Sequence, residues 1–207
     1  LPKESCHRII KYFDNHPDTE KDLIMDANSE IKQGIRKKTD MFSYSRLGGS
    51  FNSITATTTL GGDSPLNALI PTLVKGIQKY KKKFPFLDEL SAWDLFDDFN
   101  IQKFNGEKDG YFRRHCEADG PYIDRMLTWM IYLNNAKCGT RFYYPRRDVK
   151  AKEGRLVIWP GDWTYPHSGI TPNKGEKYLM TGWWTYKSYN LPYDDYLNQA
   201  IMEMKNQ

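Results

Sequence analysis

The sequence lacks the cysteine pattern of a disulfide-stabilised protein and any apolar run long enough to cross a membrane. Its three cysteines in 207 residues, Cys6, Cys116 and Cys138, are odd in number and widely spaced, with no CxxC pair. We therefore expect no disulfide framework, and a reducing, cytoplasmic setting. No apolar stretch approaches the roughly 20 residues of a membrane-spanning helix, and the first residues lack a signal-peptide pattern. We expect no membrane partner.

A strong excess of one charge is also lacking. The net charge is only +4, which permits an acidic partner without requiring one. The basic run at 79–83 follows an apolar helical face, and we interpret it as a solvated helix end, where cations suit the helix dipole. Since the sequence displays no continuous basic groove with base-stacking aromatic residues, we expect no nucleic-acid partner.

Two kinds of segment share the chain. Helical spacing of apolar residues covers about 2–14 and runs from Ser64-Pro65 to the basic run, with Pro71 kinking that helix or delaying its start. A further helix is expected over about 191–205. From about residue 94, short alternating or apolar segments are separated by turn residues, which is typical of an antiparallel sandwich or jelly roll. The expected strands are 95–104, 110–117, 127–134, 140–144, 155–159 and 176–186.

These signals predict one α+β domain over residues 1–207. Helical support is expected over about 1–90, and a jelly-roll core over about 94–186. The stretch before the second helix is harder to interpret, because 31–36 alternates like a strand and 53–59 suits an edge strand or a mobile loop. Residues 40–62 are a candidate lid over a site, with a static surface loop as the alternative.

Two histidines and a glutamate carry the candidate chemistry. His115 and Glu117 are separated by one residue in a strand-like segment, so both side chains project to the same side. His167 follows an apolar strand and can supply a third ligand. Two imidazoles and one carboxylate leave the opposite metal positions open, which is the donor set of non-haem Fe(II) oxygenases. Taken alone, each fragment is also compatible with ordinary surface residues.

A lysine ten residues after the second histidine strengthens this interpretation. Lys177 shares one face of a predicted strand with Leu179, Thr181 and Trp183. An inward-facing lysine among apolar residues is costly unless an anion meets it. Tyr132 is placed to donate a hydroxyl hydrogen bond to the same anion.

At about residues 95–186 the sequence resembles the prolyl 4-hydroxylase-like branch of the 2-oxoglutarate/Fe(II) dioxygenases. The ordered matches are Gly110-Tyr111, His115-x-Glu117, Arg125, Tyr132-Leu133-Asn134, Gly139-Thr140-x-Phe142, Lys152-x-Gly154-x-Leu156-Val157-x-Trp159-Pro160, His167 and Lys177. The resemblance implies a double-stranded β-helix, or cupin-like jelly roll, and an iron-containing oxidoreductase.

The resemblance also implies particular roles for these residues. His115, Glu117 and His167 would be the catalytic iron ligands. Lys177 and Tyr132 would hold the distal carboxylate of the co-substrate 2-oxoglutarate, and Trp183 would line the site. Two departures from the family pattern matter: the acidic ligand is Glu rather than the commoner Asp, and Phe104 stands where the family often has a co-substrate-binding Tyr.

The expected reaction couples oxidative decarboxylation of 2-oxoglutarate, giving succinate and CO2, to hydroxylation of a C–H bond by O2. A prolyl residue of a peptide or protein is the leading substrate, and ascorbate is a further expected cofactor. A free amino acid or another small molecule on the same scaffold is the first alternative. A non-enzymatic cupin-like module that binds a metal or other ligand is the second, but it leaves Lys177 unexplained.

Overall fold

The computed structural model describes residues 1–15, 20–23, 38–43, 64–105, 114–170 and 174–187. In chain order its elements are α1 (Lys3–Asp14), β1 (Glu20–Leu23), β2 (Lys38–Ser43), α2 (Leu69–Lys83), η3 (Pro85–Asp88), β3 (Trp93–Asn105), η5 (Gly120–Tyr122), β4 (Arg125–Tyr132), β5 (Gly139–Phe142), β6 (Arg147–Lys150), β7 (Leu156–Pro160), β8 (His167–Ile170) and β9 (Glu176–Tyr186).

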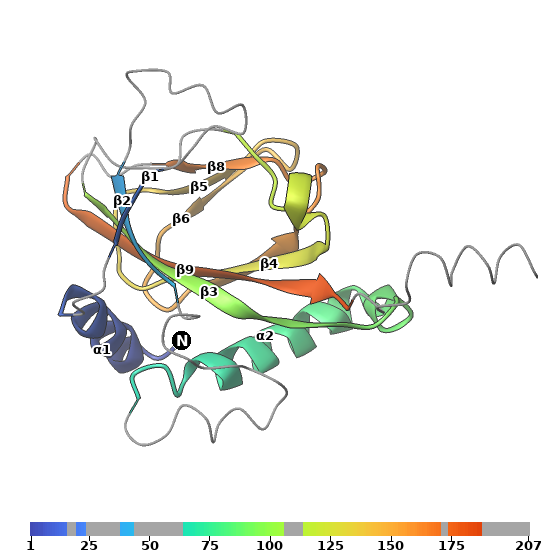
Figure 1. Cartoon of the computed structure of the whole chain (residues 1–207), viewed down its shortest axis with the longest axis horizontal. Coiled ribbons are helices and arrows are strands. Elements are labelled where there is room, and N and C mark those ends of the chain that lie inside the picture. The colour runs from blue at the N-terminus through green and yellow to red at the C-terminus, as the bar shows by residue number, and fades with distance from the viewer. Residues whose placement is uncertain (16–19, 24–37, 44–63, 106–113, 171–173, 188–207) are drawn as a thin grey trace, which may run out of the picture.

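The strands form two antiparallel sheets that face each other (Figure 1). The larger has six strands in the order β1-β2-β3-β9-β4-β7, and the smaller has three in the order β6-β5-β8. Helices α1 and α2 lie against the outer face of the larger sheet (Figure 1). Its inner face therefore looks toward the smaller sheet, and the α+β class is as expected.

The two faces of the larger sheet have different partners because strand side chains alternate. On the outer face, Ile131 and Met180 are opposite each other in the β4–β9 ladder and are fully buried with residues of both helices. On the inner face, Tyr132 and Leu179 pair in the same ladder and pack instead with Phe142 of β5. The second face is the one that can present side chains to a site between the sheets.

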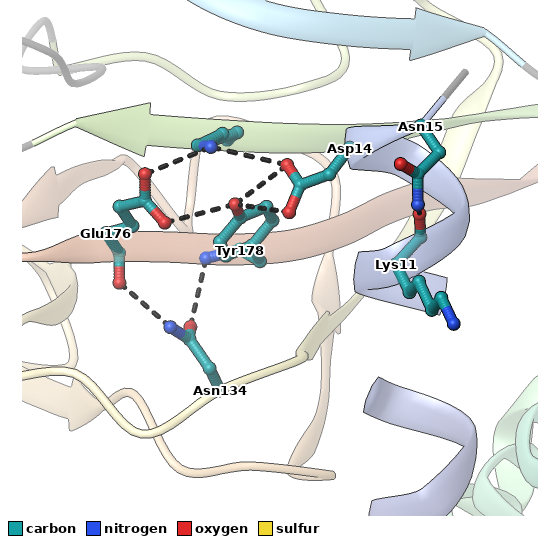
Figure 2. Close-up of polar contacts among 7 residues, drawn as sticks. Lys11, Asp14, Asn15, Asn134, Glu176 and Tyr178 are labelled. Atoms are coloured by element: carbon teal, nitrogen blue, oxygen red, sulfur yellow. Dashed lines mark hydrogen bonds and ion pairs between the residues drawn. The ribbon is translucent and has the colours of Figure 1, made fainter. Parts of the chain in front are cut away.

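Helix α1 is attached by apolar and polar contacts. Its buried residues are Cys6, Ile9 and Phe13, at the helical spacing that the sequence predicted. At its C-terminal end, Asp14 receives a hydrogen bond from the Tyr178 hydroxyl, at 2.9 Å to Oδ1 (Figure 2). Asp14 also forms an ion pair with Lys103 Nζ at 3.3 Å. The outer face of β9 is thereby tied to α1.

Helix α2 begins later than the Ser64-Pro65 signal suggested. Residues 65–68 form a turn, and the helix starts at Leu69, so that Pro71 falls in its first turn. A proline is tolerated there because the first N–H groups of a helix have no intrahelical partner. Leu69, Ile70 and Leu73 are the buried face, as expected from their spacing.

Most predicted strands from residue 94 onward are present with small shifts of their ends, but one prediction is wrong. The strand expected at 110–117 is reduced, in its described part, to an isolated bridge between His115 and His167. The chain bends after the bridge because the N–H groups of Glu117 and Ala118 both donate to the Gly161 carbonyl, at 2.9 and 2.8 Å. A regular ladder cannot form with both donors turned to one acceptor.

Several other predictions lie wholly or mostly outside the described residues. These are the strand at 31–36, the edge strand or loop at 53–59, the C-terminal helix at 191–205 and most of the candidate lid at 40–62, of which 40–43 belong to β2. All three cysteines are described and none forms a disulfide. No helix in the described part of the chain is long and apolar enough to cross a membrane.

Candidate active site

The two histidines and the glutamate lie together between the sheets. His115 and His167 form a two-way backbone bridge, with N–H···O distances of 3.0 and 2.8 Å, which places their rings 4.3 Å apart between centroids. Glu117 joins them from the bend described above. The candidate ligand atoms of the three residues all lie within 4.8 Å of one another. A single ion can therefore contact all three.

His167 is held in the orientation that a metal ligand needs. Its Nδ1 lies 3.0 Å from the Tyr165 carbonyl oxygen, and its Nε2 faces the glutamate. The Trp159 ring meets the imidazole edge to face at 5.1 Å, and Phe142 packs against it at 5.5 Å. Rotation of the imidazole is thus restricted before any ion binds.

The carboxylate of Glu117 uses its two oxygens differently. Oε1 faces the histidines, 3.5 Å from His115 Nε2 and 3.3 Å from His167 Nε2. Oε2 accepts a hydrogen bond from Trp183 Nε1 at 3.0 Å. Burial would raise the pKa of Glu117, but the two histidines outweigh it and hold the pKa below its usual range. The group is therefore an anion, as a ligand must be.

Arg125, at the start of β4, completes the surroundings of Glu117. Its Nη1 lies 3.6 Å from Glu117 Oε2. The guanidinium is stacked between two rings, 3.6 Å from the centre of Trp183 and 3.9 Å from that of Tyr122. Burial lowers the pKa of Arg125, and the nearby carboxylate opposes that effect; an arginine remains charged regardless.

Lys177 is a buried cation on the inner face of β9. Its side chain is 1% exposed, and its ammonium lies over the Phe104 ring at 4.4 Å. Among the described residues it has no carboxylate partner. Burial lowers the pKa of Lys177 from 10.5 to about 8, and the nearby Cys138 slightly opposes the change. A buried ammonium without a carboxylate partner among the described residues is suited to bind an anion.

Tyr132 lies on the same face, near the end of β4. Its hydroxyl is 2.8 Å from Thr140 Oγ1 and 3.3 Å from the Val149 carbonyl. Burial raises the pKa of Tyr132, so the phenol keeps its proton. Because the Thr140 hydroxyl can donate to the Tyr132 oxygen, the Tyr132 hydroxyl can donate its own proton either to an acceptor near Lys177 or to the Val149 carbonyl.

Asn134 fixes the backbone on both sides of Lys177. Its amide nitrogen donates to the Glu176 carbonyl at 2.8 Å, and its amide oxygen accepts from the Tyr178 N–H at 3.0 Å (Figure 2). The side chain thus replaces a backbone partner where the β4–β9 ladder ends. On the outer face, Lys103 bridges Glu176 and Asp14 beside Tyr178.

The residues present fit the groups that the sequence resemblance implies. Two imidazole nitrogens and one carboxylate suit a divalent iron ion that keeps open positions. A buried lysine with a tyrosine hydroxyl on the same face suits the far carboxylate of 2-oxoglutarate. Trp183 contacts the glutamate of the triad and is six residues from Lys177 along β9.

Sequence reasoning missed two contributors to the site. Arg125 was recognised only as part of a motif, and its contact with Glu117 crosses eight residues and a turn. Gly161 was not singled out, and a Cβ there would lie 2.5 Å from the Arg125 carbonyl oxygen. The backbone of Gly161 packs closely against that of Arg125, and this places the Gly161 carbonyl where it accepts the hydrogen bond from the N–H of Glu117. A glycine directly after the Trp159-Pro160 strand end was the available signal.

Comparison with known proteins agrees with the site. Residues 99–185 match the sequence model of the 2OG-Fe(II) oxygenase superfamily, and this stretch contains all six candidate site residues. No curated protein sequence matches the chain. The resemblance to the 2-oxoglutarate/Fe(II) dioxygenases is thus confirmed, and that superfamily implies Fe(II) and 2-oxoglutarate.

Solved structures agree with the fold. A Pseudomonas putida prolyl-4-hydroxylase is 13% identical, with a TM-score of 0.59 over 91% of this chain and 89% of that one. A Trichoplax adhaerens prolyl hydroxylase, in complex with a hypoxia inducible factor oxygen degradation domain peptide fragment, is 13% identical, with a TM-score of 0.57 over 97% and 83%. The alpha-ketoglutarate-dependent epimerase SnoN from nogalamycin biosynthesis is 12% identical, with a TM-score of 0.58 over 93% and 79%. The jelly-roll prediction is confirmed.

A separate cavity of about 440 Å³ lies on the opposite face of the larger sheet. It is bounded by α2, η3, the start of β3 and Trp184 of β9, and its walls are mainly apolar. None of the candidate site residues lines it.

Proposed function

We propose that the protein is an Fe(II)- and 2-oxoglutarate-dependent oxygenase that hydroxylates a C–H bond, with a prolyl residue of a peptide or protein as its substrate. The observation that carries the proposal is the convergence of His115, Glu117 and His167 on one point, with the buried, unmatched charge of Lys177 on the inner face of the same core. Neither feature is expected of a purely structural jelly roll.

Each residue has a defined task in this proposal. His115 Nε2, Glu117 Oε1 and His167 Nε2 hold the iron, which when bound supplies the oxidative chemistry with 2-oxoglutarate and O2. Lys177 pairs with the far carboxylate of the co-substrate, and Tyr132 adds a hydroxyl donor. Phe104 cannot donate a hydrogen bond, but its ring supports the Lys177 ammonium, and so it replaces a polar contact by a cation–π contact.

The prolyl assignment rests on the family branch that the sequence resembles and on the prolyl hydroxylases among similar structures. A free amino acid or other small molecule is the second candidate. The epimerase named above supports it, because a comparable TM-score accompanies a different reaction. Ascorbate belongs to the proposal as a reductant that keeps the iron ferrous.

We also propose that residues 1–207 form a single domain. One apolar cluster supports this proposal, because it contains Ile9 of α1, Leu73 of α2, Ile131 of β4 and Met180 of β9. Separate domains would each need a core of their own.

Succinate release measures the proposed activity. Purified protein with Fe(II), ascorbate, 2-oxoglutarate and O2 is screened against proline-containing peptides and against free amino acids. We expect iron-dependent succinate formation, stimulated by a peptide and accompanied by a mass increase of one oxygen atom on proline. His167→Ala should abolish it. Metal binding without succinate from any substrate would favour the non-enzymatic alternative, and stimulation by free amino acids alone would favour the second candidate.

A further inference from the structure

We propose that Trp183 and Arg125 are positioning residues that reserve one oxygen of Glu117, so that this glutamate offers only its other oxygen to the metal. The inference rests on the proposed metal centre and concerns a feature particular to this chain, a glutamate where an aspartate is commoner. Oε1 is the oxygen that faces both histidines, while Oε2 faces away and is held by the indole and the guanidinium.

The length of glutamate makes such a restraint useful. Glutamate has one more rotatable bond than aspartate, and its carboxylate can bind a cation with both oxygens. A second oxygen on the metal would occupy a position that the co-substrate needs. At 3.0 Å the indole N–H bond satisfies Oε2 and opposes the rotation that would bring it to the metal.

The indole, which donates a hydrogen bond, and the guanidinium, which forms an ion pair, suit this task because neither can compete with the glutamate. An indole offers one N–H and no acceptor, and a guanidinium offers only donors, so neither can become a metal ligand. Both are also rigidly placed. Trp183 is 7% exposed and stands opposite Thr128 in the β4–β9 ladder. The Arg125 side chain is 14% exposed and is stacked between Trp183 and Tyr122.

Trp183→Phe is the variant that isolates the proposed contact. It removes the N–H donor and keeps a ring beside Arg125. Trp129→Phe is the matched control: Trp129 is also buried, its indole N–H has no partner among the described residues, and it lies on the outer face. Arg125→Met tests the ion pair without relying on the folding of the first variant.

The measurements are the visible absorption of Co(II)-loaded protein, whose band intensity reports coordination number, and calorimetric titrations with Co(II) and then with 2-oxoglutarate. For Trp183→Phe we expect Co(II) to bind, the absorption before 2-oxoglutarate is added to weaken toward higher coordination, and the 2-oxoglutarate dissociation constant to rise about tenfold or more. Arg125→Met should change both quantities in the same direction. The Trp129→Phe protein should match the wild type.

Two results would overturn the inference. If the absorption and the 2-oxoglutarate affinity of Trp183→Phe and Arg125→Met both equal those of Trp129→Phe, Oε2 is not being reserved. If the wild type itself binds no Co(II), the proposed metal centre fails and the positioning role fails with it. The first result leaves the metal centre intact, so the two failures are distinguishable.

Discussion

Replacing Lys177 by methionine should stabilise the protein in the absence of co-substrate, although it removes a residue proposed to be essential. Methionine keeps the apolar stem and removes the charged end. Keeping the buried ammonium charged costs about 3 kcal/mol, because burial lowers the pKa of Lys177 from 10.5 to about 8 and each pH unit corresponds to about 1.36 kcal/mol. We therefore expect the free energy of unfolding at pH 7 to rise by as much as about 3 kcal/mol.

The gain should depend on pH with a definite sign. Below about pH 8 the lysine is charged in both the folded and the unfolded protein, so the wild type bears the whole burial cost. Between about 8 and 10.5 the folded lysine has released its proton and the unfolded one has not. Since the unfolded state then binds more protons, wild-type stability rises with pH in this window. The advantage of Lys177→Met should vanish toward pH 10.5.

Urea unfolding of both proteins at pH 7 and pH 10 measures these differences. Lys103→Met is the matched control, because Lys103 has carboxylate partners at 3.3 Å on Asp14 and 3.0 Å on Glu176 and should lose stability when replaced. In the same Lys177→Met protein the affinity for 2-oxoglutarate should fall about 10- to 100-fold, the value of a charge-assisted hydrogen bond. A destabilised Lys177→Met, or a gain that does not change with pH, would refute the reasoning.

The remaining predictions concern the supports of the site. The 2-oxoglutarate dissociation constant of the wild type should be constant below about pH 7 and rise up to about tenfold per pH unit above pH 8, as Lys177 loses its proton; a flat calorimetric profile contradicts this. Asn134→Ala should weaken 2-oxoglutarate binding several-fold and cost about 1–2 kcal/mol of stability, because it leaves two backbone groups beside Lys177 unpaired; unchanged affinity in titration would exclude the support. Tyr178→Phe should lower the free energy of unfolding in urea by about 1–2 kcal/mol and leave the 2-oxoglutarate affinity nearly unchanged, because Tyr178 lies on the outer face; a comparable loss of affinity would contradict this separation of stability from binding. Gly161→Ala should lower Co(II) affinity about tenfold, since its Cβ would displace the carbonyl that orients Glu117; wild-type metal affinity would count against that geometry.

The fold was predictable where alternating or apolar segments are bounded by turn residues. The strands β3 and β9 were expected within two residues of their ends on this signal, although β9 is buried on both faces. By contrast β1, Glu20–Leu23, is short and polar, and β6, Arg147–Lys150, is mostly exposed. Strand β8, His167–Ile170, was not among the expected strands; a proline precedes it and a glycine lies within it. These strands owe their structure to their neighbours in the sheet.

The candidate site was predictable in its charged residues and less so in their supports. The spacing of His115 and Glu117 predicted that both side chains project to the same side of the chain. They do lie together, but a bend in the chain, and not a regular strand, brings them there. Lys177 was identified because a charged residue interrupts an apolar strand face. The contact between Trp183 and Glu117 depends on which indole edge faces the site, and no sequence pattern records that.

A crystal structure with Mn(II) in place of Fe(II) and with 2-oxoglutarate is the most direct measurement of the central claim. We predict an anomalous scattering peak whose protein ligands are His115 Nε2, His167 Nε2 and, of the two Glu117 oxygens, Oε1 only, with the far carboxylate of 2-oxoglutarate on Lys177 Nζ. A metal bound elsewhere, or a co-substrate carboxylate that leaves Lys177 without a partner, would contradict the account.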